Sequence, residues 1–172
     1  PDASGRNLWY RHQPRPRSVW NTRHETMSHT HLLYHIVFGT KDHVPLISPT
    51  WEEELYRYLG GIIRNHKGEP IAINGMPEHT HVFARLGPVV ALSDFVRDLK
   101  AGSSKWIRNN HQPKFSWQRR YGAFSVSESA ANIVRDYVRN QKQHHLERNF
   151  ENEYKGLLRQ HNVDFDDKYL WD

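Results

Sequence analysis

The sequence contains no cysteine, which excludes disulfide bonds, thiolate nucleophiles and zinc sites built on cysteine. Any metal ion must therefore be bound by histidine, carboxylate or amide ligands. No apolar run is long enough to span a membrane, and no basic start followed by an apolar stretch marks a secretion signal. A phosphate-binding glycine loop of the P-loop type is absent as well. We therefore expect a cytoplasmic protein with no membrane partner and no nucleotide cofactor.

Positive charge is unevenly distributed along the 172 residues, which carry a net charge of +5. Residues 97–142 hold ten lysines and arginines against three acids, whereas seven acids oppose four bases from residue 143 onward. A basic segment of this kind favours a polyanion partner, although an ordinary solvated surface gives the same composition. The candidate nucleic-acid contacts in this segment are Lys105, Arg108, Lys114, Arg119, Arg120, Arg139 and Lys142.

Aromatic residues are interleaved with these bases at Trp106, Phe115 and Trp117. Exposed rings beside cations can stack on unpaired bases of a single strand. The same rings are equally compatible with a place in the hydrophobic core. We expect some of them in the core and some on the surface.

The first 26 residues show neither helical nor alternating periodicity and contain a PRPR sequence. This pattern predicts a flexible basic arm over residues 1–26, to which we assign no part in any chemistry. Met27 follows directly and reads as the start of the folded domain, residues 27–172.

The first half of that domain alternates between strand and helix patterns. An apolar, β-branched and aromatic run that begins at His31 and closes on Gly39 predicts a strand. Thr50, with Glu53 three residues later, forms a capping-box pattern before a helix. The apolar side chains of this helix recur at spacings of three and four; they are Trp51, Leu55, Tyr58, Leu59, Ile62 and Ile63. Two strands, Pro70–Asn74 and His79–Leu86, then predict a hairpin.

The second half contains two longer helical patterns. One begins at Ser93 or Asp94, and the Gly-Ser-Ser sequence at 102–104 predicts a kink or an early end within it. The other covers about 128–145 and is capped by Ser127. Extended segments at 115–117 and 121–126 separate them, and a short helix is expected over 151–160.

This order, β-α-β-β-α-β-α, predicts an α+β fold. We expect a ferredoxin-like or RRM-like split βαβ arrangement, with an antiparallel sheet and helices on one face.

His79-Thr80-His81 lies at the start of a predicted strand. Residues two apart in a strand project to the same face, so both imidazoles can bind one metal ion. A similar triplet at 29–31 shows that the spacing alone is not diagnostic. The later triplet follows a tight turn at a sheet edge and continues into apolar residues, which favours it as the metal site. A structural or surface role is expected for the earlier one.

Tyr137 and Gln141 are four residues apart on the predicted third helix and therefore share one face. Together with the histidine pair, these two residues could form a site for phosphodiester cleavage. The phenolate of Tyr137 would attack the phosphodiester, and the amide oxygen of Gln141 would be a third metal ligand. By spacing alone, a partly buried structural tyrosine is the better interpretation. His144 and His145 follow one turn later, where plain surface positions are expected.

Several separated segments together resemble one known family. They are GMPEHTHVFARL, WQRRYGAFSVSES and YVRNQKQHH, followed by FENEY and KYLWD. In this order they resemble the single-tyrosine HUH transposases, closest to the insertion-sequence-200-like branch and its REP-associated tyrosine transposases. The resemblance spans residues 27–172, and MSHTHLLYHIVFGTKDHVPLI is similar to the usual start of the family.

The resemblance implies an enzyme that cleaves and rejoins single-stranded DNA at hairpin-flanked ends through a 5′-phosphotyrosine intermediate. By the family pattern, Tyr137 is the nucleophile, and His79, His81 and Gln141 bind a divalent metal, Mg²⁺ or Mn²⁺. The family also implies a homodimer in which the tyrosine helix of one subunit completes the histidine pair of the other. The family usually has a bulky hydrophobe where this chain has Thr80. A β-branched threonine suits a strand, so we expect the ligand geometry to be retained.

Two alternatives differ in what the protein does with nucleic acid. A host-recruited relative that cuts repeated palindromes would need the same site residues. A non-catalytic RRM-like module would instead bind nucleic acid on an exposed sheet face, but the strands lack the aromatic motif of those domains.

Overall fold

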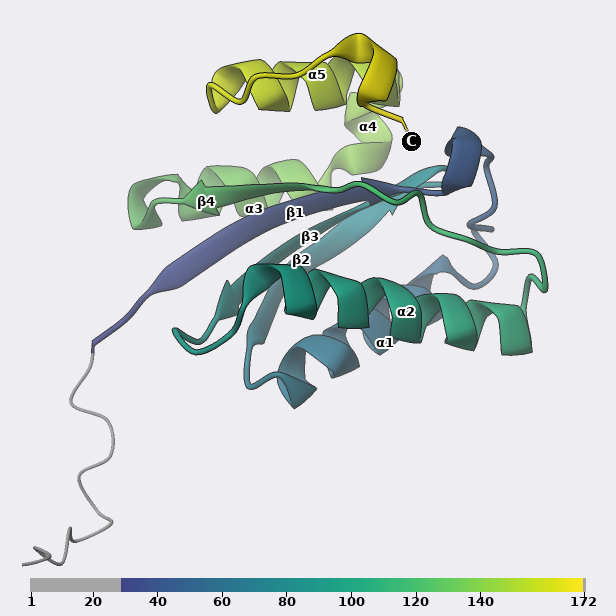
Figure 1. The fold of residues 1–172 in the computed structure, drawn as a ribbon, viewed down its shortest axis with the longest axis horizontal. Coiled ribbons are helices and arrows are strands. Elements are labelled where there is room, and N and C mark those ends of the chain that lie inside the picture. The colour runs from purple at the N-terminus through teal and green to yellow at the C-terminus, as the bar shows by residue number, and fades with distance from the viewer. Residues whose placement is uncertain (1–28, 172) are drawn as a thin grey trace, which may run out of the picture.

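The computed structural model describes residues 29–171 and contains one four-stranded sheet of order β2-β3-β1-β4 (Figure 1). All three neighbouring pairs are antiparallel. The strands are β1 (Leu32–Gly39), β2 (Glu69–Met76), β3 (His79–Leu86) and β4 (Gly122–Val126). The α+β class, the antiparallel sheet and the hairpin of β2 and β3 are thereby confirmed. The expected arm over 1–26 lies outside the described residues.

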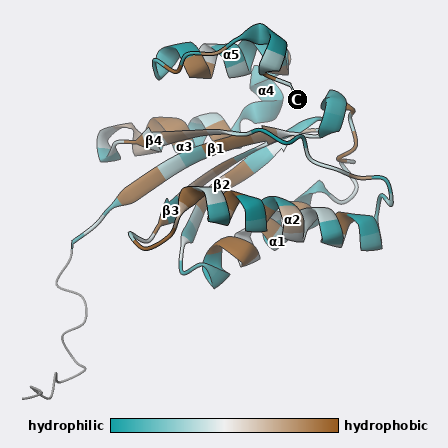
Figure 2. Cartoon of the chain, viewed as in Figure 1, coloured by the Kyte–Doolittle hydropathy of each residue, from teal (hydrophilic) through white to brown (hydrophobic). Residues whose placement is uncertain are grey.

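Helices α1 (Glu52–Asn65) and α2 (Leu92–Asn110) connect the strands and cover one face of the sheet (Figure 1). The side chains of β1 and β3 that point to this face are apolar and alternate along each strand, as Ile36, Phe38 and Val82 do. They pack with the apolar stripe of α1, including Leu55 and Leu59, in the largest core cluster. In Figure 2 the central strands are largely apolar, and hydrophilic residues colour much of the outer helices.

The opposite face of the sheet is covered too, which corrects the expectation of helices on one face only. Helices α3 (Ala131–Arg139), α4 (Gln141–His144) and α5 (Phe150–Gln160) lie there (Figure 1). β1 and β3 also carry apolar side chains on this face: Leu33 and Phe83 pack with Val138 of α3, and Val37 packs with Phe150 of α5. Strands with large apolar side chains on both faces are buried on both faces, so the sheet needs a second layer of helices.

The third predicted helix is divided in the structure. It begins as a short 3-10 turn at Glu128–Ala130, and a break at Asn140 separates α3 from α4. The side chain of Ser127 makes no capping hydrogen bond, and neither does the residue before α1, where Trp51 rather than Thr50 takes the N-cap position. Ser127 thus takes the predicted N-cap position without the capping hydrogen bond, whereas the predicted cap at Thr50 is wrong.

Helix α2 is continuous through residues 102–104, contrary to the expected kink. The hydroxyl of Ser103 donates to the carbonyl of Leu99, at 2.6 Å, and accepts a hydrogen bond from Nε1 of Trp117, at 2.9 Å. Both polar groups are thus satisfied inside the core, which removes the reason for a break.

Trp117 forms only an isolated bridge with Thr40, so the expected extended segment at 115–117 is not a strand. None of the helices in residues 29–171 is long and apolar enough to cross a membrane.

Candidate functional site

The histidine pair lies at the start of β3, directly after the two-residue turn of the hairpin. His79 and His81 project to the face covered by α3 and α5, and both are 0% exposed. Their ring centroids are 5.0 Å apart. Thr80 lies between them and projects to the other face, as alternation along a strand requires. The expected convergence of the two imidazoles is confirmed. The earlier triplet is separate from them, because the exposed His31 hydrogen-bonds Glu128 at 2.7 Å.

Tyr137 and Gln141 belong to the helical layer that covers this face of the sheet. Tyr137 is in the last turns of α3, and its ring meets the rings of His81 and His35 edge-on, each at 5.9 Å between centroids. Gln141, the first residue of α4, is 0% exposed, and its Nε2 lies 3.5 Å from the carbonyl oxygen of Tyr137. Across the break at Asn140, both side chains remain in contact with Glu153, which in turn lies beside the histidine pair of the same chain.

Glu153 of α5 connects these groups, although it was not among the residues predicted from the sequence. Its Oε1 accepts hydrogen bonds from the hydroxyl of Tyr137 and from Nε2 of Gln141, the latter at 3.1 Å. Its Oε2 lies 2.9 Å from Nε2 of His145 and 3.4 and 3.6 Å from Nε2 of His81 and His79. The acid lies on the same side of α5 as Phe150, Tyr154 and Leu157, so its place on an apolar helix face was a readable sign of burial.

His145 was expected at the surface, and this prediction is wrong. Its side chain is 4% exposed. After α4 ends, the chain reverses into α5, and this reversal turns His145 toward Glu153. His144 stays exposed, with its ring 4.9 Å from that of Tyr137.

Three buried atoms in this cluster have no hydrogen-bond partner: Nε2 of His79, Nε2 of His81 and Oε1 of Gln141. All three atoms carry lone pairs suited to a divalent cation. The second ring nitrogens are engaged, Nδ1 of His79 by Glu78 at 3.1 Å and Nδ1 of His81 by Nε2 of His35 at 2.9 Å. Such contacts hold the rings of metal-binding histidines in place. The ligand atoms of His79, His81, His145 and Glu153 all lie within 4.8 Å of one another. The residues present therefore fit a metal ion.

The protonation states suit metal binding. Burial lowers the pKa of His79 to about 4, so its imidazole is neutral near pH 7. Burial alone would raise the pKa of Glu153, but the hydrogen bonds from His145 and Tyr137 and the proximity of His81 outweigh it and hold that pKa well below its usual range. Burial and the charge of Glu153 raise the pKa of Tyr137, so the phenol keeps its proton in this arrangement.

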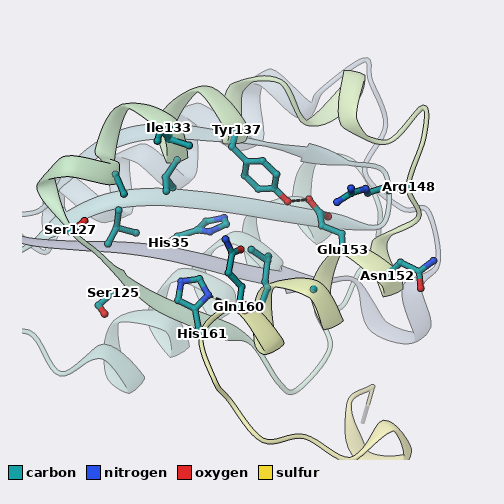
Figure 3. A pocket seen from close by; sticks show the side chains of 15 residues that line it. His35, Ser125, Ser127, Ile133, Tyr137, Arg148, Asn152, Glu153, Gln160 and His161 are labelled. Atoms are coloured by element: carbon teal, nitrogen blue, oxygen red, sulfur yellow. Dashed lines mark hydrogen bonds between the residues drawn. The ribbon is translucent and has the colours of Figure 1, made fainter.

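A cavity of about 830 Å³ opens beside Tyr137 (Figure 3). It lies between β4, α3 and α5, and Arg148 and Glu153 stand at its Tyr137 end. Tyr137 and Glu153 therefore adjoin a space that can admit a ligand.

The candidate nucleic-acid contacts do not share one face with this site. All seven are exposed. Lys105 and Arg108 belong to α2, which covers the opposite face of the sheet, and Lys142 of α4 pairs with Glu52. The remaining members are Lys114, Arg119 and Arg120, between α2 and β4, and Arg139, at the end of α3.

Two of the three interleaved aromatic residues belong to the core. Phe115 and Trp117 are 1% and 6% exposed. Trp106 is half-buried and stacks on Tyr58 at 5.1 Å. Their packing explains the aromatic pattern without base stacking.

Comparison with known proteins places these residues in a family. A model described as "Transposase IS200 like" matches residues 28–141. The chain belongs to the IS200-like transposase family. The matched segment contains the histidine pair, Tyr137 and Gln141, whereas His145, Arg148 and Glu153 follow it. Among curated proteins, none matches this chain.

Two solved structures share the fold of this IS200-like chain. A candidate transposase from Deinococcus radiodurans R1 is 24% identical, with a TM-score of 0.56 over 67% of this chain and 95% of that one. A REP-associated tyrosine transposase bound to a REP hairpin is 16% identical, with a TM-score of 0.51 over 63% of this chain and 65% of that one. They confirm the α+β architecture.

Proposed function

We propose that this chain is a metal-dependent transposase that cleaves and rejoins single-stranded DNA at hairpin-flanked ends through a 5′-phosphotyrosine intermediate. One observation carries the proposal: the hydroxyl of Tyr137 joins a buried cluster in which His79 and His81 keep unpartnered Nε2 atoms. A nucleophile beside metal-binding atoms is the arrangement that phosphoryl transfer needs. Membership of the transposase family supports a DNA substrate.

The metal would be held by Nε2 of His79, Nε2 of His81 and Oε1 of Gln141, the unpartnered atoms. When bound, Mg²⁺ or Mn²⁺ neutralises charge on the non-bridging oxygens of the scissile phosphate. The buried neutral imidazole of His79 binds such an ion without first losing a proton.

The covalent step belongs to Tyr137. As the Tyr137 oxygen forms a bond to the scissile phosphorus, its proton passes to Glu153 Oε1, which already accepts its hydrogen bond. The bond from that phosphorus to the preceding 3′ oxygen breaks, and the proton passes on from Glu153 to the 3′ oxygen, which leaves as a hydroxyl. Attack by a 3′-hydroxyl on the phosphotyrosine reverses these steps. The phosphotyrosine conserves the energy of the broken bond, so rejoining needs no ATP.

We propose further that each chain cleaves with its own tyrosine, which differs from the expectation of a homodimer with sites completed in trans. Support comes from the contacts of Tyr137, which already reaches Glu153 and the rings of His35 and His81 in the same chain. Homodimer formation itself stays a prediction of the family resemblance.

A host-recruited palindrome nuclease is the second candidate. The similarity of the fold to a REP-associated transposase bound to a REP hairpin favours it. A non-catalytic RRM-like module is disfavoured, because α3 and α5 cover the sheet face that such a module would expose.

The proposal is tested by incubating the protein with Mn²⁺ and a labelled single-stranded hairpin oligonucleotide, followed by denaturing electrophoresis. We expect a covalent adduct with the wild type and with Tyr121→Phe, and none with Tyr137→Phe or His81→Ala. Tyr121 is a fair control because it packs beside the core on the other face of the sheet. An adduct that persists in Tyr137→Phe would overturn the assignment of the nucleophile.

A further inference from the structure

The cavity beside Tyr137 has the size of a ligand site rather than of a packing defect. Its volume of about 830 Å³ lies within the roughly 300–1,000 Å³ typical of small-molecule sites. β4 forms its floor, and α3 and α5 form its walls. Gly156 of α5 lines it, and a Cβ atom placed there would meet no atom within 4 Å. The space in front of Gly156 is therefore unobstructed.

One part of the lining is apolar. Val126, Val134 and Leu157 contribute to it, together with Ile133, which is 73% exposed. An isoleucine on α3 that faces open space can provide a surface for a flat, weakly polar group. This part of the cavity suits the ring of a nucleobase.

The rest of the lining offers hydrogen-bonding groups that the protein does not use internally. Among residues 29–171, no hydrogen bond engages the side chains of Ser125, Asn152 and Gln160. Figure 3 shows these side chains around the cavity, from β4 and α5. A hydroxyl and two amides provide both donors and acceptors, which is what the polar edge of a base requires.

Arg148 places a positive charge at one end of the cavity. It is the only lysine or arginine in the lining, and it forms no ion pair with any described residue. In Figure 3 it stands at the end of the cavity where Tyr137 meets Glu153. A guanidinium matches two phosphate oxygens in a bidentate contact. A phosphate at Arg148 would thus lie next to the nucleophile.

We propose that this cavity binds one unpaired nucleotide of the DNA strand, with its phosphate at Arg148 and its base between α3 and α5. This assignment rests on the proposed function and specifies where the nucleotide that carries the scissile phosphate lies. A base inside a duplex cannot enter such a cavity, so the site selects single-stranded DNA. Arg148, Asn152 and Gly156 follow the segment that the family model matches.

The test uses Gly156→Phe, which fills the cavity, with Gly61→Phe as the matched control. Both glycines lie inside helices and both have no atom within 4 Å of an added Cβ, but Gly61 belongs to α1 on the other face of the sheet. Arg148→Ala removes the phosphate contact, and its control is Arg159→Ala, which removes an exposed arginine of α5 outside the cavity. Thermal unfolding establishes that each variant is folded.

Binding of deoxynucleoside 5′-monophosphates is followed by amide NMR shifts without metal, so the result does not depend on cleavage. We expect shifts at Ser125, Gly156 and Gln160, and an affinity reduced about tenfold or more in Gly156→Phe and in Arg148→Ala. The two controls should stay within about twofold.

Shifts elsewhere, no shifts at all, or undiminished binding by Gly156→Phe would overturn the nucleotide site. Equal binding of inorganic phosphate would overturn the base contact. Failure of the covalent adduct assay, with nucleotide binding intact, would instead count against the proposed function.

Discussion

Glu153 is the residue on which the arrangement of the site depends most. Its carboxylate contacts Tyr137, Gln141 and His145, and it is 7% exposed. Glu153→Ala leaves these buried partners unpaired, so we expect a loss of about 3 kcal/mol in the free energy of unfolding. Urea denaturation measures it.

The control for that measurement is Glu151→Ala in the same helix. Glu151 is 52% exposed in its ion pair with Lys155, and its removal should cost less than about 1 kcal/mol. Equal losses in the two variants would show that Glu153 is not a connecting residue.

His79 gives the metal-free protein a pH-dependent stability. Its pKa of about 4 in the folded chain is below the value of about 6.5 for a free histidine. The unfolded chain therefore binds more protons between these values, and stability is present above about pH 6.5 and is lost as the pH falls toward 4. The contribution is about 3 kcal/mol.

Urea denaturation with a chelator, at about pH 7 and about pH 4, measures this loss. His79→Gln should reduce the dependence on pH. A wild-type stability that does not change over this range would contradict the buried neutral state of His79.

The sequence allowed the principal site residues to be found but not all of their neighbours. Strand alternation was enough to place His79 and His81 together, and the family resemblance singled out Tyr137 and Gln141. His145 was missed because its inward direction depends on the reversal between α4 and α5, which leaves no periodic signal. Glu153 did carry such a signal, because it shares the apolar face of α5, but a lone acid on that face was not taken as a site residue.

At the scale of elements, periodic patterns predicted the local features, and features set by packing between distant segments were not predicted. The stripe of α1 and the β2–β3 hairpin were correct because each follows one period over many residues. The break at Asn140 and the second helical layer were not foreseen, because both depend on contacts between distant segments.

The position of α5 is set by its close contact with β4. A Cβ atom at Gly122 would lie 2.9 Å from Cε2 of Tyr154, so Gly122→Ala should displace α5 and cost about 1–3 kcal/mol. Because α5 carries Glu153, formation of the covalent adduct should slow as well. Chemical denaturation and the adduct assay measure the two effects.

Gly61→Ala is the matched control for this variant. Its added Cβ meets no atom within 4 Å, and alanine in a helix interior should raise stability by up to about 1 kcal/mol. Unchanged stability and adduct formation in Gly122→Ala would mean that α5 is not held by this contact.

At the scale of the whole molecule, one chain brings together every group that the proposed cleavage needs. The sheet supplies His79 and His81, and the second helical layer supplies Tyr137, Gln141 and Glu153. We therefore propose that a partner subunit is not required to complete the site. This proposal differs from the trans arrangement implied by the family resemblance.

The most direct test is to co-express His81→Ala with Tyr137→Phe and to assay the mixture for the covalent adduct with Mn²⁺ and single-stranded hairpin DNA. A site within one chain predicts an adduct with the wild type and none with the mixture, because neither variant retains both groups. Adduct formation by the mixture would contradict the account, since it would show that the tyrosine of one subunit works with the histidines of another.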